Sequence, residues 1–166
     1  YVLHASGDPK VSNVLVTQND VRQIQLAKAA LYAGIKLLMD EMGVTAVDRI
    51  RLAGAFGSHI SVSHAMVLGL IPDCDLEQVT SAGNAAGAGA RMALLDRNAR
   101  LEIAATIAKA ERIETAVADD CQAHFVGAMG LPHQSDPFPN LFSVVSPPAA
   151  KVVESADSPK RRRRRS

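Results

Sequence analysis

The segment Arg49–Ile60 constrains the fold most, because a strand signal runs directly into two glycines and the start of a helix. Its first part, Ile50–Ala53, has the character of a short strand. Gly54 and Gly57 follow one helical turn apart, and glycine lets a backbone turn sharply and approach another group closely. This pattern predicts a tight strand-to-helix connection. It also suits a ligand site in which main-chain N–H groups face a flat or anionic group, and the segment alone leaves both interpretations open.

The strongest helix signal precedes this turn and spans about Asp20–Met42. Thr17 and Asp20 have the spacing of a capping box, and Gly43 supplies a natural stop. Apolar positions recur at steps of three and four, which predicts one buried face. That face consists of Val21, Ile24, the stem of Lys28, Leu31, Ile35, Leu38 and Met42. A lysine in this setting most often extends its ammonium group to the surface.

Strand and helix signals alternate through the first 131 residues. The predicted strands are Tyr1–Ala5, Val14–Thr17, Asp48–Ala53, Val79–Ala82 and an edge strand at Arg112–Val117, and shorter helices are expected near residues 64–68, 84–95, 98–110 and 120–129. This alternation predicts an α/β domain. In open α/β sheets ligands bind beyond the carboxyl ends of strands. Gly54 and the pair Gly83-Asn84 would both lie there, which strengthens the ligand-site interpretation.

The charges divide the chain into two parts. The net charge is +1, but Lys160–Arg165 carry six of the 18 basic residues, and the remaining 12 basic and 17 acidic residues give the rest a charge of −5. Residues 132–166 are rich in Pro, Ser and Asp and lack periodicity, which predicts a disordered tail that ends in an Arg run. Without interleaved aromatic residues this run favours weak polyanion contact over specific nucleic-acid binding.

Several site classes are disfavoured by the residues present. Cys74 and Cys121 form no CxxC motif, which argues against a disulfide framework or zinc site and indicates a reducing, cytoplasmic compartment. His59 and His64 lack the i, i+4 spacing of metal ligands. No apolar run has the length of a membrane span. Because the chain starts at Tyr1 within a strand signal, we expect an N-terminally truncated fragment.

Four sequence blocks stand in a fixed order: TQNDVRQIQLAKAA at residues 17–30, LAGAFG at 52–57, GLIPD at 69–73 and GNAAGAGAR at 83–91. Together they resemble the C-terminal domain of the reductive activators of corrinoid proteins, and the resemblance covers roughly residues 1–131. Those activators belong to the superfamily of acetate and sugar kinases, heat-shock chaperones and actin. The resemblance therefore implies an α/β fold that forms half of such an ATPase, with a small mixed sheet flanked by helices.

The resemblance also implies a function, the ATP-driven reduction of an inactive cobalt centre in a methyltransferase system. The implied cofactor is ATP with magnesium. An iron–sulfur cluster is expected only in the missing N-terminal part, since no C-x4-C-x2-C series occurs here. The implied partner is a corrinoid protein or its methyltransferase, and the full-length form is expected to be a homodimer. The two phosphate-binding loops of the superfamily are not found, so this chain alone is expected to lack ATPase activity.

The implied nucleotide contacts can be assigned to individual residues. The adenosine motif of the superfamily matches Leu52–Ser58, which gives Gly54, Ala55, Phe56, Gly57 and Ser58 as candidates, with Ala55 in place of one of two adjacent glycines. Gln25 and Lys28 match an E-x-x-K pattern whose side chains flank the adenosine in the chaperones, although Gln25 has lost the charge. Asn84 is the last candidate and could instead be only a helix cap. The alternative function is a non-catalytic module that pairs with a separate phosphate-binding half through its small-residue helix.

Overall fold

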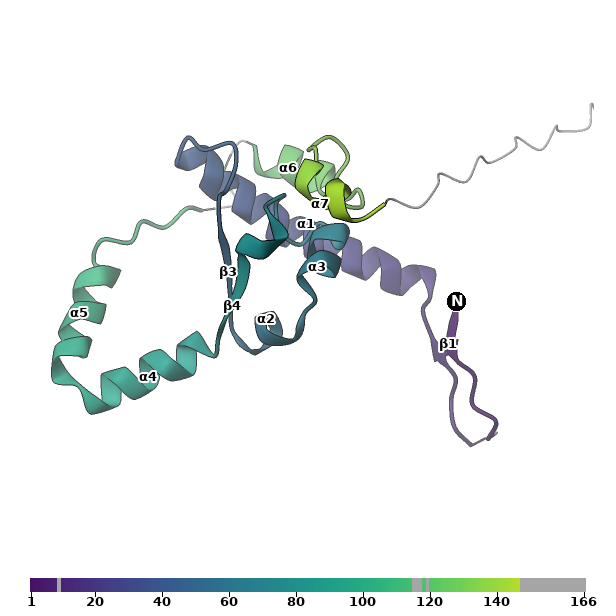
Figure 1. The fold of residues 1–166 in the computed structure, drawn as a ribbon, viewed down its shortest axis with the longest axis horizontal. Coiled ribbons are helices and arrows are strands. Elements are labelled where there is room, and N and C mark those ends of the chain that lie inside the picture. Colours follow the sequence, from purple (N-terminus) through teal and green to yellow (C-terminus); the bar gives the residue numbers. More distant parts are fainter. Residues whose placement is uncertain (9, 115–117, 119, 147–166) are drawn as a thin grey trace, which may run out of the picture.

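The computed structural model describes residues 1–8, 10–114, 118 and 120–146. Its longest element is α1 (Gln18–Glu41), which crosses the molecule (Figure 1). The Thr17 hydroxyl accepts from the Asp20 N–H, and the Asp20 carboxylate accepts from the Thr17 N–H at 2.8 Å, so the predicted capping box is confirmed. No helix in the described ranges, α1 included, is long and apolar enough to cross a membrane.

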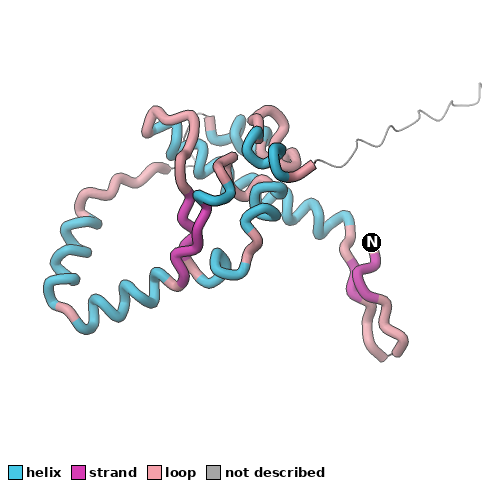
Figure 2. Tube along the Cα trace, in the orientation of Figure 1, coloured by secondary structure: helices cyan, strands magenta, loops and turns pink. Residues whose placement is uncertain are grey.

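The other elements confirm the predicted α/β class (Figure 2). They are β1 (Val2–His4), β2 (Val14–Leu15), β3 (Ile50–Ala53), α2 (Ala55–His59), α3 (Val62–Leu68), a 3-10 turn (Leu76–Gln78), β4 (Val79–Gly83), α4 (Ala85–Leu95), α5 (Arg97–Ile107), α6 (Cys121–Gly127) and α7 (Pro139–Val144). The strands form two small sheets, an antiparallel β1–β2 hairpin and a parallel β3–β4 pair. Of the predicted edge strand, residues 112–114 are not in a strand, and residues 115–117 lie outside the described residues.

The buried face of α1 is rotated from the predicted one. Lys28, Ala29, Tyr32, Ala33, Leu37 and Met39 are buried, whereas Val21, Ile24, Leu31, Leu38 and Met42 are 40 to 74% exposed. The buried set also contains residues four apart, such as Ala29, Ala33 and Leu37, so a helical repeat alone could not choose between the two faces. Helix α6 packs against α1 and selects the stripe with the small residues Ala29 and Ala33, which allow close approach.

The core lies between α1, α3 and the chain that follows α6. It contains Ala29, Tyr32, Ala65, Met66, Ile71, Cys74, Val79, Ala128, Phe138 and Leu141. We call residues 128–146 the C-terminal strap, because they return across α1 and end in α7 beside α3 (Figure 1). Asp73 holds the start of α7 in place, because its carboxylate accepts hydrogen bonds from the main-chain N–H groups of Asn140 and Leu141 at 3.0 Å.

The strap corrects the prediction that disorder begins at residue 132. Phe138 is 2% exposed and Leu141 is fully buried, so residues 132–146 belong to the folded domain. Composition was misleading here because the segment is stabilised by contacts with residues far away in the chain, which no local pattern reports. Residues 147–166, including the Arg run, lie outside the described residues.

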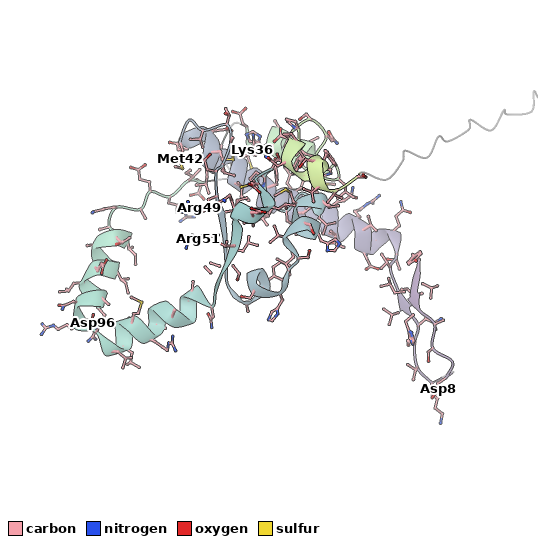
Figure 3. All side chains as sticks on the ribbon, viewed as in Figure 1. Asp8, Lys36, Met42, Arg49, Arg51 and Asp96 are labelled. Atoms are coloured by element: carbon pink, nitrogen blue, oxygen red, sulfur yellow. The ribbon has the colours of Figure 1, made fainter. Side chains whose placement is uncertain are left out.

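Two parts of the chain that the structure describes project from this core. The β1–β2 hairpin extends at one end, with Asp8 near its tip, and the α4–α5 arm extends at the other, with Asp96 at its corner (Figure 3). Helix α4 packs mainly against α5. The arm leaves large apolar side chains 58 to 82% exposed, namely Met92, Leu94, Leu95, Leu101 and Ile107. It is therefore an apolar helical surface outside the core.

Candidate functional site

The two predicted glycine turns lie side by side at one edge of the parallel sheet. Strands β3 and β4 run in the same direction, and their carboxyl ends lead into α2 and α4. Gly54 has φ +104° and Gly83 has φ +65°, a region that favours glycine because a Cβ atom would be strained there. The Gly54 N–H donates to the Gly83 carbonyl oxygen at 2.8 Å. The structure thus joins two motifs that are 29 positions apart in the sequence.

Gly57 provides a close approach between α2 and β3. A Cβ atom at this position would lie 2.8 Å from Leu52 Cβ and 3.1 Å from the Leu52 carbonyl group. Phe56 beside it is 75% exposed and adds nothing to the core. Helix α2 has five residues, too short for its dipole to attract an anion strongly, so this turn suits a flat apolar group better than a phosphate.

Ser58 and Asn84 are bonded within the turns themselves. The Ser58 hydroxyl donates to the Gly54 carbonyl oxygen at 3.2 Å. The Asn84 side-chain oxygen accepts from the Gly87 N–H at 2.9 Å, so its role as the N-cap of α4 is confirmed. A Cβ atom on Gly87 would lie 2.6 Å from the Asn84 amide nitrogen, so Gly87 leaves room for the cap. A nucleotide contact by either side chain stays a prediction.

Gln25 and Lys28 are bonded to the C-terminal strap. The Gln25 amide donates to the Met129 carbonyl oxygen at 3.0 Å, and the Lys28 ammonium donates to the carbonyl oxygens of Gly130 and Pro132, the latter at 2.6 Å. Lys28 is fully buried and does not extend to the surface. Its predicted contact with adenosine stays a prediction, and a nucleotide would have to replace these carbonyl groups. Sequence reasoning missed this role because main-chain carbonyls about a hundred positions away carry no side-chain signature.

A polar cluster forms where the strap contacts α1, and the sequence did not indicate it. The Tyr32 hydroxyl donates to the Asp136 carboxylate at 2.8 Å, and Lys36 lies 3.4 Å from the same carboxylate. Burial raises the pKa of Tyr32, and the Asp136 hydrogen bond adds to that shift. Together with Asp73 these residues line a cavity of about 610 Å³. Because the carboxylates of Asp73 and Asp136 already hold the strap, the cluster serves attachment of this segment.

Lys28 gives a testable pH dependence. Burial lowers its pKa from 10.5 to about 8. Between these two values the unfolded chain binds more protons than the folded chain, so the free energy of unfolding should rise with pH over this interval. Denaturant titrations at about pH 7.5 and about pH 9.5 should show this gain in the parent and a smaller gain in Lys28→Met. The comparison removes the contributions of groups that both chains share, such as Cys74, and an equal gain in both chains would contradict the assignment.

The residues present do not fit a metal or iron–sulfur centre. Within the described part of the chain no three His, Cys, Asp or Glu side chains are placed to hold a metal ion. Cys74 is buried and Cys121 is partly buried, and a two-iron cluster requires four ligands. We therefore derive no chemistry through magnesium or an iron–sulfur cluster at these residues.

Comparison with known proteins agrees with the fold. A family model described as the C-terminal domain of RACo, the ASKHA domain, matches residues 1–142, which includes most of the strap. The corrinoid activation enzyme RamQ of Eubacterium limosum is 42% identical over 98 residues, which cover 58% of this chain and 16% of that protein. A solved structure of a reductive activator for corrinoid, iron-sulfur protein has a TM-score of 0.67 and 32% identity, and the match covers 73% of this chain and 20% of that chain.

The chain spans a fifth or less of the length of these relatives. Its family assignment rests on the family model, which covers well over half of its residues. The resemblance inferred from the four sequence blocks is thereby confirmed. This chain belongs to the family of C-terminal ASKHA domains of the corrinoid reductive activators.

Proposed function

We propose that this chain is the nucleotide-binding portion of a corrinoid reductive activator and holds the adenosine end of ATP at Gly54–Ser58 and Asn84. The observation that carries the proposal is the pair of glycine turns at one sheet edge, joined by the hydrogen bond from Gly54 to Gly83. Backbone free of side chains beside the exposed Phe56 ring suits the flat, partly apolar surface of a nucleoside. The family to which the chain belongs supports the choice of a nucleotide.

The proposed role is binding without turnover by this chain alone. No phosphate-binding loop was identified in the sequence, and the short α2 helix gives little attraction for an anion. The wider function, ATP-driven reduction of a cobalt centre in a cytoplasmic corrinoid protein or methyltransferase, would require the remaining parts of an activator. Two relatives whose names describe corrinoid activation support this assignment.

Calorimetric titration of the purified chain tests the proposal. Adenosine and ATP should bind with similar affinity, because the contacts lie at the nucleoside end. Asn84→Ser should weaken both without lowering the unfolding midpoint, since serine caps a helix about as well as asparagine but lacks the amide group. The control is Asn98→Ser, an exposed asparagine in the first turn of α5, which should bind as the parent does. A folded parent chain that binds neither ligand would overturn the proposal.

The exposed apolar arm favours a second candidate, a non-catalytic module that pairs with a separate phosphate-binding half. Met92, Leu94 and Leu95 on α4 are 58 to 82% exposed, which is costly unless another surface covers them. On this hypothesis nucleotide binding requires both halves. Tight binding of ATP by a monomeric preparation, with the mass established by light scattering, would count against it.

A further inference from the structure

Four hydrogen bonds close a ring around the two glycine turns. The Gly54 N–H donates to the Gly83 carbonyl oxygen at 2.8 Å, and the Gly83 N–H donates to the Ser81 hydroxyl oxygen at 3.2 Å. The Ser81 hydroxyl donates to the Ser58 hydroxyl oxygen at 3.2 Å, and the Ser58 hydroxyl donates to the Gly54 carbonyl oxygen at 3.2 Å. Each of the four residues therefore donates once and accepts once within the ring.

An irregularity in the sheet places Ser81 in this ring. Leu52 pairs with Ser81, but Ala53 pairs with Gly83, so one residue of β4 bulges out between them. A bulge changes the direction of the neighbouring side chains and often lies beside a functional site. Here it brings the Ser81 hydroxyl within reach of both the Gly83 N–H and Ser58.

The ring lies at the surface and not in the core. Ser58 and Ser81 are exposed, and neither belongs to the cluster of buried apolar residues. Hydrogen bonds between exposed groups compete with water and add little to the stability of the whole domain. Their effect is local, because they add to the pairing of Ala53 with Gly83 and fix the separation and orientation of the two glycine turns.

We infer that Ser81 is a positioning residue for the nucleoside site, which holds the Gly54 and Gly83 turns in the arrangement that binds adenosine. The inference rests on the proposed function. Ser81 was not among the predicted site residues, and it makes its contribution through Ser58 and Gly83. A threonine at this position keeps the hydroxyl, whereas a valine of nearly the same shape removes it.

Ser81→Thr and Ser81→Val therefore form a matched pair. Ser81→Val should raise the Kd for adenosine and for ATP by about fivefold, the size expected for one lost hydrogen bond. Ser81→Thr should bind as the parent does, and all three chains should unfold at the same denaturant concentration. Equal affinity of the two variants, or weak binding by both, would overturn the inference.

Amide hydrogen exchange separates this inference from the proposed function. The Gly54 and Gly83 amides should exchange faster in Ser81→Val than in the parent, and Ser81→Thr should restore their protection. This result is independent of any ligand. If the parent binds no nucleotide, the proposed function fails. Amide exchange at Gly54 and Gly83 then tests by itself whether Ser81 holds the two turns. Unchanged protection in Ser81→Val would show that Ser81 does not hold the turns.

Discussion

Replacing Gly69 with alanine should lower the free energy of unfolding by about 3 kcal/mol, because a close contact adds to backbone strain. Gly69 ends α3 with φ +70°, where a Cβ atom is strained. That Cβ would overlap the Pro132 carbonyl oxygen and lie 2.9 Å from Lys28 Nζ. The substitution therefore disturbs the place where Lys28 holds the C-terminal strap. Denaturant unfolding measures the loss, and faster proteolysis of the strap should accompany it.

Gly43→Ala is the matched control for this change. Gly43 has nearly the same backbone conformation, φ +65°, but a Cβ atom there would meet nothing within 4 Å. Its substitution should lower the free energy of unfolding by about 1 kcal/mol, because backbone strain at positive φ is the only contribution. Equal losses from Gly43→Ala and Gly69→Ala would mean that the strap does not lie against Gly69.

Phe138→Ala should lower the free energy of unfolding by about 4 kcal/mol, because removal of a buried aromatic ring leaves a cavity in the core. Phe138 is 2% exposed, and its ring centroid lies 6.4 Å from that of Tyr32. The loss should appear as a lower denaturant midpoint, with Tyr32 becoming more accessible to solvent. This substitution tests whether the strap is part of the cooperative folding unit.

Phe142 on α7 provides the control for Phe138. Its side chain is 43% exposed, so Phe142→Ala should cost about 1 kcal/mol. Each variant removes one phenyl ring from the strap, and the two rings differ in how deeply they are buried. Similar small losses from both would show that the strap is not packed on α1, and would restore the prediction that disorder begins near residue 132.

Features that depend on neighbouring residues were predictable. The capping box of Thr17 and Asp20, the stop at Gly43 and the glycine turn at Gly54 involve positions within a few residues of each other. Their geometry follows from local hydrogen bonds and from the freedom of glycine at positive φ. The parallel arrangement of β3 and β4 could also be predicted, because alternating strands and helices place successive carboxyl ends at one edge of the sheet.

Within the candidate site, the sequence indicated the positions but not their bonding. Gly54, Ser58 and Asn84 were identified by their place in motifs. The ring through Ser81 was not, because its link from Ser81 to Ser58 spans 23 positions and depends on a bulge. Serine is too common in turns and strand ends for its type alone to indicate such a role.

By itself, the sequence determined where α1 starts and stops, where the chain turns at Gly54 and Gly83, and which family it resembles. Only the tertiary structure decided which stripe of α1 is buried and how residues 132–146 fold. Two stripes of α1 had acceptable periodicity, and the choice was made by α6 and the strap, whose carbonyl oxygens bind Lys28. The physical reason is that burial and long-range hydrogen bonds depend on groups brought together from about a hundred positions away, whereas caps and turns depend on their immediate neighbours.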